Sequence, residues 1–447
     1  MLKVLAAKSK LEIDEQNYRT FRNYAVKLNR RKKKLFFNNA FIDCKNDSKK
    51  VWNTVKGLLG TSISSCPSSV EVDGRIITKP VDIANHFADF FTKKINLLSN
   101  NVNIHSSKQA IVQWIDDHIM SNKICSFSLQ TVSVEEVLNL LKSLPDGKST
   151  GYDLMDNFLL RCAAPQIAVP LRCIFNWSLE KGMFANVWKH AKLCPIPKDC
   201  KEPATPANSR PISLLPTLSK ILEGIVSRQI WEYMENNDLI TANQHAYRKN
   251  HSTTTALVDM TDQWLNAMDN GKFVGVLFLD FSAAFDLVDH EIILTKLMHY
   301  GFKEVALNWV QSYLTDRKQS TYINGSFSSP HALNCGIPQG SCLGPLLYLI
   351  YTNDLSYALA ETQATVFADD TTIYAAGQSV QQVQQALQGD LENIREWVCQ
   401  NKLVLNTKKT KVMLVCSTRK RPKQHGIQLS MGGVQIEEVA ETKLLGV

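Results

Sequence analysis

The stretch VFADDTTIY, residues 366–374, places two carboxylates, Asp369 and Asp370, side by side in a run that otherwise has strand character. A turn is one interpretation, because the Asp side chain bonds to the nearby backbone in hairpin loops. A metal site is the other, because buried carboxylates persist where a cation compensates their charge. The rest of the chain has to decide between the two.

A third carboxylate, Asp280, ends the apolar run KFVGVLFLD over residues 272–280. This run is typical of a central strand that is buried on both faces. Helical segments separate it from Asp369 and Asp370, so the two strands can be neighbours in one sheet. The three carboxylates would then meet, and Mg²⁺ binds a few carboxylates together with substrate phosphates and water. Two such ions, about 3.5–4 Å apart, would activate an attacking oxygen and stabilise a leaving one.

The segment NCGIPQGSCLGPLLYLIYTNDL, residues 334–355, indicates a glycine-containing turn that leads into a helix. Gly340 would allow close backbone approach by a ligand, Ser341 could cap the helix, and Pro345 falls in its first turn. The start of this helix would offer N–H donors to the phosphates or sugar of a nucleotide. A plain structural turn stays open for this segment alone.

Basic residues occur where a triphosphate would need them, at Arg210, at Lys220 and in the NTKKTK group at 406–411. Lys and Arg clamps are the usual protein contribution to phosphoryl transfer. Taken singly, each is also typical of a surface cation.

The charge of the chain is uneven. Residues 1–50 hold 14 Lys and Arg against 5 Asp and Glu, a net of +9, while the other 397 residues hold 36 against 37, a net of −1. The peak is RRKKK at residues 30–34, which suits phosphate contacts but is also typical of a solvated face or a localisation signal.

Composition places the protein in a broad class. The 447 residues, 44% apolar and 21% charged, indicate a folded protein of about two or three domains. No apolar run approaches the roughly 20 residues of a membrane span, and MLKVLAAKSK lacks a secretory apolar core. Eleven scattered cysteines without metal-site spacing favour reduced thiols. We expect an intracellular protein of the nucleus, the cytoplasm or both, neither secreted nor membrane-bound.

Apolar periodicity predicts the elements that position these groups. Helices are expected over residues 1–60 (ending at Gly57 or Gly60), 81–95, 132–144 (capped by Ser133), 217–234 and 380–398, and strands over 272–280, 366–374 and 401–415. The recurrent prolines over 195–216 exclude a long helix there.

In their order along the chain, these segments resemble the motifs of reverse transcriptases in the style of non-LTR (LINE-type), jockey-like retrotransposons. LFLDFSAAFDLVDH, GIPQGSCLGPLLYLIYTNDL, VFADDTTIY and LVLNTKKTK are similar to motifs A to D, and ETKLLGV to the start of the primer-grip motif. SRPISLLPTLSKILEGIVSRQI and NQHAYRKNHSTTTAL resemble the two finger motifs, and KSTGYDLMDNFLLR the motif before them. Eight motifs in the family's order make a specific signal over nearly the whole chain.

The resemblance implies an α+β protein with a right-hand polymerase fold, in which fingers and a palm follow a helical N-terminal extension. The antiparallel sheet of the palm would pack on helices. The implied parts are a basic helical linker (1–60), a helical and loop connector (61–125), an N-terminal extension of the fingers (126–200), the fingers (201–270) and the palm (271–447), with the reverse transcriptase domain at about 192–447. The endonuclease and thumb of such proteins would lie outside this chain, as in a fragment of a longer reading frame.

The resemblance also assigns roles to residues. Asp280, Asp369 and Asp370 would be catalytic ligands of two Mg²⁺ ions, for which Mn²⁺ can substitute, with Asp280 and Asp369 ranked first. Lys409 would protonate the leaving pyrophosphate, and Phe285 would lie under the sugar and exclude a 2′-hydroxyl. The remaining implied contacts are to the nucleotide pocket (Gln339, Gly340), the triphosphate (Arg210, Lys220) and nucleic acid (Arg30, Arg31, Lys32, Lys33, Lys34, Arg248).

The expected activity is RNA-directed DNA polymerisation, in which dNTPs are added to a DNA 3′-OH by in-line attack on the α-phosphate. The partners are then an RNA template, a DNA primer and dNTPs, and the oligomeric state is not predicted. One alternative is a catalytically inactive, truncated or co-opted relic that binds nucleic acid. Another is a different palm-fold enzyme, such as a group II intron maturase or a viral RNA polymerase, although FSAAFD and FADD favour the retrotransposon.

Overall fold

The computed structural model describes residues 12–44, 50–52, 54–55, 67–72, 74–101, 113–114, 126–198, 204–417 and 426–447. The chain divides into two compact units, residues 1–65 and residues 66–447. Within the described ranges, no helix combines the length and the apolar character needed to cross a membrane.

The first unit contains one long helix, α2, which spans Glu12–Asp43. The prediction that a single helix continues to Gly57 or Gly60 is wrong, because Cys44 forms a turn in which its N–H bonds to the carbonyl of Phe41 at 3.3 Å. Such an i→i+3 bond tightens a last helical turn. Residues 50–52 and 54–55 are helical again, while both glycines lie outside the described residues.

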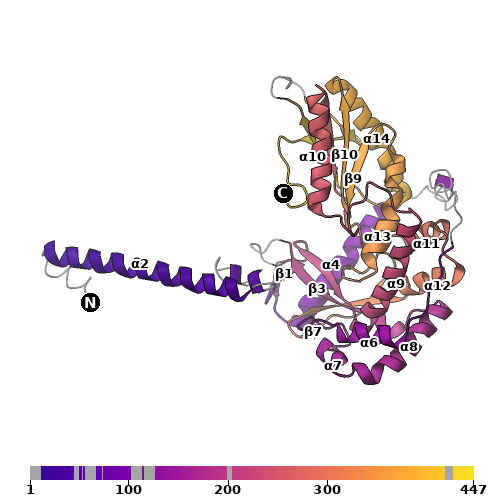
Figure 1. Cartoon of the computed structure of the whole chain (residues 1–447), viewed down its shortest axis with the longest axis horizontal. Coiled ribbons are helices and arrows are strands. Elements are labelled where there is room, and N and C mark those ends of the chain that lie inside the picture. The colour runs from indigo at the N-terminus through magenta and orange to yellow at the C-terminus, as the bar shows by residue number, and fades with distance from the viewer. Residues whose placement is uncertain are drawn as a thin grey trace. The chain divides into compact units, whose positions relative to one another are not determined.

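The second unit is a mixed α+β structure (Figure 1). Its helices are α4 (Pro80–Asn101), α6 (Val134–Lys142), α7 (Asn157–Cys162), α8 (Ala164–Lys181), α9 (Thr217–Asn236), α10 (Thr253–Asp269), α11 (His290–His299), α12 (Glu304–Leu314), α13 (Gly344–Thr352) and α14 (Val380–Gln400), with 3-10 turns η1 (Asn186–Trp188) and η2 (Asn353–Ala358). The helices predicted over 81–95, 132–144, 217–234 and 380–398 are confirmed as α4, α6, α9 and α14. The predicted cap is also present, since Ser133 Oγ accepts the N–H of Glu136 at 3.1 Å.

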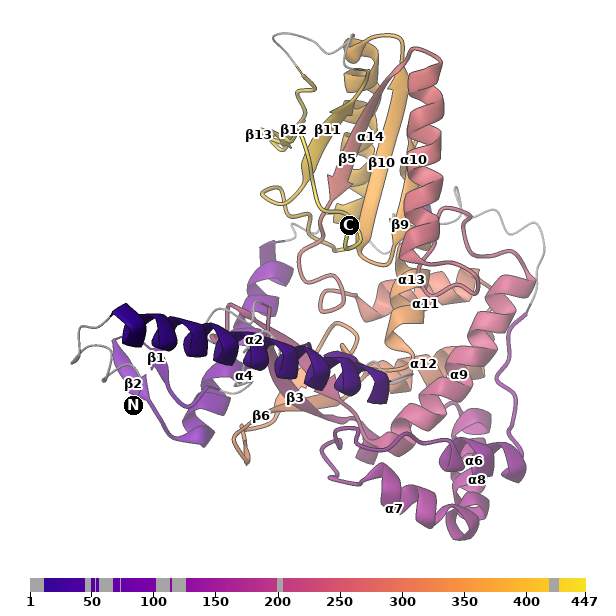
Figure 2. The same ribbon diagram turned by 60° about the vertical axis from the view of Figure 1, so that its left-hand side comes forward.

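A five-stranded sheet, called here the C-terminal sheet, has the order β14-β11-β5-β10-β9 (Figure 2). Its strands are β14 (Glu437–Glu438), β11 (Lys411–Val415), β5 (Phe273–Leu279), β10 (Asp370–Gly377) and β9 (Gln363–Phe367). All neighbours are antiparallel except β11 and β14, which are parallel. The strand predicted over 401–415 is therefore shorter than expected. The first part of this segment contains a turn over residues 406–410, in which the carbonyl of Asn406 accepts the N–H groups of Lys409 and Thr410.

The prediction that β5 is a central strand buried on both faces is confirmed. Leu277 and Leu279 lie in the main core on the side of α14, while Val274 and Val276 lie in a second cluster on the side of α10. Figure 1 shows the strands between these two helices. Because apolar side chains leave β5 on both faces, helices cover both faces of the sheet.

A second sheet, called here the N-terminal sheet, has the order β4-β3-β6-β7, with β8 also paired to β6. Its strands are β3 (His190–Pro197), β4 (Ser209–Leu214), β6 (Arg317–Ile323), β7 (Ser326–Phe327) and β8 (His331–Leu333). Phe87 and Phe91 of α4 pack with Leu193 and Ile323 of this sheet. A separate hairpin pairs β1 (Val70–Val72) with β2 (Arg75–Ile77), and another pairs β12 (Ser430–Met431) with β13 (Val434–Gln435).

The proline-rich segment forms strands, in agreement with the exclusion of a long helix. Pro195 of β3 lies opposite Pro211 of β4. The parallel pairing of β3 with β6 extends only over residues 190–193, so Pro195 lies beyond the part of β3 that has a second neighbour. Proline is tolerated there because no ladder bond is required of its nitrogen.

Candidate active site

Adjacent strands bring the three predicted carboxylates to one end of the C-terminal sheet. Thr371 of β10 lies opposite Leu279 of β5, so the register places Asp370 at the level of Asp280. The hairpin loop between β9 and β10 carries Asp369 next to Asp370. Partial burial, followed by the charges of Asp369 and Asp280, raises the pKa of Asp370. The three carboxylates therefore share one electrostatic environment. The register also confirms the prediction that the strands that carry them are neighbours in one sheet.

The loop that presents Asp369 is strained. Phe367 pairs with Asp370, which leaves a two-residue loop of Ala368 and Asp369, and Ala368 has a φ of 58°. Asp369 is not among the residues with a positive φ, so the loop has the backbone pattern of a II′ turn, where glycine is favoured first.

We expect Ala368→Gly to stabilise the protein by about 0.5–1 kcal/mol, because a left-handed φ disfavours a Cβ. Urea unfolding of the two proteins measures this difference. An unchanged or lower stability in Ala368→Gly would show that the loop bears no strain.

The donor set suits a hard divalent cation. Carboxylate oxygens are the protein ligands that Mg²⁺ takes, and a cation would offset the charges of Asp369 and Asp280, which after burial are the causes that raise the pKa of Asp370. In the part of the chain that the structure describes, however, no group of three or more His, Cys, Asp or Glu side chains is arranged to hold a metal. The chemistry of the site fits the predicted ions, and the assignment of ligands stays a prediction.

Lys409 lies beside the first carboxylate. Its Nζ is 3.9 Å from Asp280 Oδ2, and the side chains are 69% and 38% exposed. The backbone fixes this proximity, since the N–H of Asn406, at the head of the turn before Lys409, donates to the carbonyl of Asp280 at 2.8 Å. A solvated pair at this distance adds little stability, so its interest lies in where it places an ammonium group.

A group of cations, called here the basic cluster, comprises Lys94, Lys198, Arg210 and Lys409. Burial lowers the pKa of Lys198, and the charges of Lys94, Lys409 and Arg210 lower it further. Predicted residues from β4 and from the 406–410 turn thus lie in the same field. Sequence reasoning missed Lys94 and Lys198, because neither belongs to a motif and Lys94 lies in α4, within the segment interpreted as a connector.

The aromatic residue predicted to lie under the sugar is held by stacking. The ring of Phe285 lies 4.6 Å from that of Tyr348 on α13, with an angle of 20° between the planes. Tyr348 is buried, and its hydroxyl has no hydrogen-bond partner among the residues that the structure describes. Burial, followed by the charge of Asp369, raises the pKa of Tyr348. This stack fixes Phe285 close to the carboxylates.

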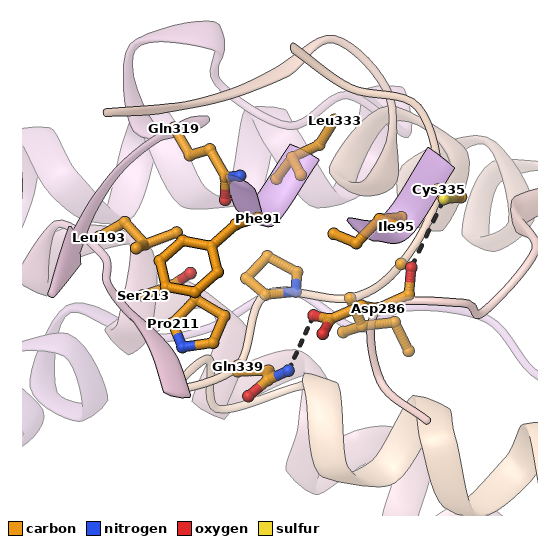
Figure 3. A pocket seen from close by; sticks show the side chains of 13 residues that line it. Phe91, Ile95, Leu193, Pro211, Ser213, Asp286, Gln319, Leu333, Cys335 and Gln339 are labelled. Atoms are coloured by element: carbon orange, nitrogen blue, oxygen red, sulfur yellow. Dashed lines mark hydrogen bonds between the residues drawn. The ribbon is translucent and has the colours of Figure 1, made fainter. Parts of the chain in front are cut away.

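The segment called here the 335–344 loop carries the other predicted pocket residues. Gln339 Nε2 donates to Asp286 Oδ1 at 2.8 Å (Figure 3), and the carbonyl of Gln339 accepts the N–H of Ser213 at 2.7 Å. Gly340 has a φ of 118°, and a Cβ there would lie 2.5 Å from the carbonyl oxygen of Ser213. Gly340 is therefore required by the close contact of its backbone with strand β4. The sequence alone instead predicted that this glycine allows close approach by a ligand.

Figure 3 shows the small cavity behind Gln339, lined by apolar side chains such as Phe91 and Leu333 together with Asp286. Its volume of about 20 Å³ suffices for roughly one water molecule and excludes a nucleotide. Burial raises the pKa of Asp286 from 3.8 to about 6, although the bond from Gln339 and the charge of Lys94 oppose this change. The Asp286 carboxylate in the lining of the cavity thus orients the Gln339 amide, and the cavity is too small to be the nucleotide site.

The buried carboxyl of Asp286 makes the free energy of unfolding depend on pH. Because its folded pKa is raised, its favourable contribution is complete below about pH 4 and is lost as pH rises through about 6. We expect Asp286→Asn to gain about 2–3 kcal/mol on the parent between pH 4 and pH 7, measured as unfolding free energy in urea. A difference that is constant over this range would contradict the buried, ionisable Asp286.

The backbone donors at the start of α13 are already in use. The N–H groups of Cys342 and Leu343 donate to Glu223 Oε2 at 2.9 and 3.5 Å, and the N–H of Gly344 donates to Ser341 Oγ at 2.9 Å. The prediction that these donors are offered to a nucleotide is wrong, because a carboxylate of the protein already provides the anion. The prediction that Ser341 caps the helix is wrong, because the N-cap residue is Leu343, which makes no side-chain cap hydrogen bond; Ser341 lies two residues earlier, and Pro345 lies in the first turn.

The remaining predicted residues lie in separate places. Burial, followed by the charge of Glu223, raises the pKa of Cys342, and the charge of Lys220 opposes this change, so Lys220, in the first part of α9, lies near the 335–344 loop. Arg248 Nη1 donates to the carbonyls of Thr241 and Gln244, both at 3.3 Å, which holds its own loop and competes with the predicted nucleic-acid contact. The five cations of the basic run are exposed on α2, in the first unit: Arg30, Arg31, Lys32, Lys33 and Lys34.

Comparison with known proteins places this geometry in a family. Residues 196–447 match the family model of the reverse transcriptase (RNA-dependent DNA polymerase). The chain is 30% identical over 329 residues to the probable RNA-directed DNA polymerase from transposon BS of Drosophila melanogaster, covering 72% of this chain and 36% of that protein. It is 31% identical over 324 residues to the RNA-directed DNA polymerase from mobile element jockey of Drosophila funebris, covering 71% and 35%.

The Drosophila melanogaster protein from mobile element jockey is 30% identical over 317 residues, covering 68% of this chain and 34% of its own length. The chain thus spans about a third of the length of these curated relatives. Both the family model and these relatives lead to the same assignment. The chain belongs to the reverse transcriptase family and is related to the jockey-like members from non-LTR retrotransposons.

Proposed function

We propose that this protein adds deoxynucleotides to the 3′-OH of a DNA primer on an RNA template, by in-line attack on the α-phosphate of a dNTP. The observation that supports this most is the meeting of Asp280 with Asp369 and Asp370 at the ends of adjacent strands. One residue of the basic cluster, Lys409, lies beside these carboxylates, next to Asp280. Paired opposite charges of this kind suit a metal-bound triphosphate.

Each group has a role in this proposal. Asp280, Asp369 and Asp370 would hold two Mg²⁺ ions, which would supply Lewis-acid stabilisation of the attacking and leaving oxygens. The basic cluster balances the triphosphate, and Lys409 donates its proton to the leaving pyrophosphate. The exposed cations of α2 contact nucleic-acid phosphates, which makes binding weaker as salt increases.

Phe285 selects the sugar in the same proposal. Because its ring is fixed by the stack on Tyr348, it cannot move aside for a 2′-hydroxyl. We expect Phe285→Ala to raise incorporation of UTP relative to dTTP at least about tenfold, since the variant removes a steric clash and not a catalytic group. The ratio of kcat/KM for the two nucleotides measures this, and an unchanged ratio would remove Phe285 from sugar selection.

Primer extension tests the proposed activity directly. Oligo(dT) annealed to poly(rA) with Mg²⁺ should be extended by the parent protein with dTTP and much less with UTP. Preference for UTP would instead indicate an RNA polymerase. Absence of extension with either nucleotide, while the template remains bound, would contradict the proposed polymerase activity of this chain.

A further inference from the structure

Glu223 is a fully buried carboxylate in the first half of α9, and the proposed function does not use it (0% exposed). Its Oε1 accepts the hydroxyl of Ser219, one turn earlier on the same helix, at 2.6 Å. Its Oε2 accepts the hydroxyl of Tyr313 at 3.3 Å, as well as the N–H groups of Cys342 and Leu343. One side chain thus joins α9 and α12 to the 335–344 loop.

The position of this carboxylate is electrostatically favourable. It faces the start of α13, where unsatisfied N–H groups and the helix dipole stabilise an anion. Burial of a carboxylate without such donors is costly, and the four contacts supply them to a side chain that is 0% exposed. The loop is consequently tied to α9 by charge-assisted hydrogen bonds, which are about twice as strong as neutral ones.

The two elements joined by Glu223 carry the predicted nucleotide contacts. Lys220 lies three residues before Glu223 on α9, and Gln339 and Gly340 lie just before Cys342 in the loop. We infer that Glu223 is a positioning residue for the nucleotide: its carboxylate sets the distance between Lys220 and the Gln339–Gly340 backbone. This inference rests on the proposed function, because it concerns the same nucleotide site.

A matched control is available within the chain. Asp390 of α14 is also buried, and its carboxylate accepts backbone N–H groups of Ala360, Glu361 and Thr362 at 2.7–3.0 Å. It therefore performs the same chemistry on a loop that precedes β9, away from the predicted nucleotide contacts. Glu223→Gln and Asp390→Asn each remove one charge and leave one acceptor oxygen.

The test compares these two variants with the parent in primer extension on poly(rA)–oligo(dT). We expect Glu223→Gln to raise KM for dTTP about tenfold with a smaller change in kcat, because the neutral carboxamide keeps only one acceptor oxygen for the four donors that contact the carboxylate. Asp390→Asn should lose comparable thermal stability but keep the KM of the parent. Hydrogen exchange should be faster at residues 342–343 in the first variant and at residues 360–362 in the second.

Two results would overturn the inference. The first is an unchanged KM for dTTP in Glu223→Gln although the amides of residues 342–343 exchange faster. The second is an equal rise of KM in Asp390→Asn, which would show a general effect of stability. If the parent extends no primer, the proposed function fails, whereas faster exchange at 342–343 in Glu223→Gln would still show that the carboxylate holds the loop.

A milder variant covers the case in which Glu223→Gln does not fold. Ser219→Ala removes the hydrogen bond to Glu223 Oε1 and keeps the carboxylate. It should raise KM for dTTP two- to fivefold in the same direction, with kcat nearly unchanged. A KM equal to that of the parent, measured in folded Ser219→Ala, would count against the positioning role.

Discussion

Asp280→Asn is expected to lower the rate of dTTP incorporation on the order of a thousandfold or more while RNA remains bound. The substitution keeps the shape of the side chain but removes one of the charges that meet at the ends of β5 and β10. Stabilisation of charge in the transition state is usually the largest single catalytic contribution, so its loss exceeds the effect of a peripheral substitution. Primer extension measures the rate, and filter binding at several salt concentrations measures the affinity for RNA.

The same assay distinguishes a polymerase from a catalytically inactive nucleic-acid-binding protein. Asp262→Asn, at an exposed acid of α10, serves as a control and should keep the parental rate. A rate in Asp280→Asn within threefold of the parent would remove Asp280 from catalysis. If the parent itself is inactive, and both proteins bind RNA with the same salt dependence, the chain acts as a nucleic-acid-binding protein.

The second large effect concerns a buried ion pair between α11 and η2. Lys296 Nζ of α11 lies 2.8 Å from Asp354 Oδ1 of η2, and the two side chains are 1% and 0% exposed. Burial lowers the pKa of Lys296 and raises that of Asp354, and each charge opposes the shift of the other. We expect Lys296→Met to reduce the unfolding free energy by about 3–5 kcal/mol, because it leaves a carboxylate buried without its cation.

Urea unfolding of Lys296→Met and of the double variant Lys296→Met, Asp354→Leu tests this explanation. The double variant should recover most of the loss, since apolar side chains of similar volume replace a buried pair at little cost. A single variant that loses less than about 1 kcal/mol would show that Asp354 finds water or another partner. A double variant as unstable as the single one would show that packing, not charge, matters here.

Local patterns were sufficient to predict the elements that carry the carboxylates. The apolar run before Asp280 specifies β5, and the spacing of apolar residues over 380–398 specifies α14. The single strand expected over 366–374 is instead two strands, β9 and β10, joined by a turn at Ala368 and Asp369. Because each of these strand-like runs has a carboxylate at its end and helical segments lie between them, the sequence also indicated that the strands could be neighbours in one sheet. What these patterns share is that each is complete within about 20 neighbouring residues.

Long-range pairing could not be predicted in the same way. Residues 190–214 and 317–333 form one sheet, and Lys94 reaches the basic cluster from α4, although no local signal links these segments. Glu223 looks like an ordinary polar residue of a helix until the loop after Gln339 is placed against it. Such contacts depend on which faces meet, which a single sequence does not reveal.

The parallel pairing of β3 with β6 sets a requirement on biosynthesis. His190 lies opposite Lys318, so the ribosome has to add 128 residues after His190 before the partner of this residue exists. At about 5–20 residues per second, this delay is roughly 6–26 s. During that time β3 and β4 can form only a hairpin with an open edge, a state prone to association with other chains. High contact order therefore makes folding of this sheet slow, and nascent chains that end before β6 should depend on chaperones.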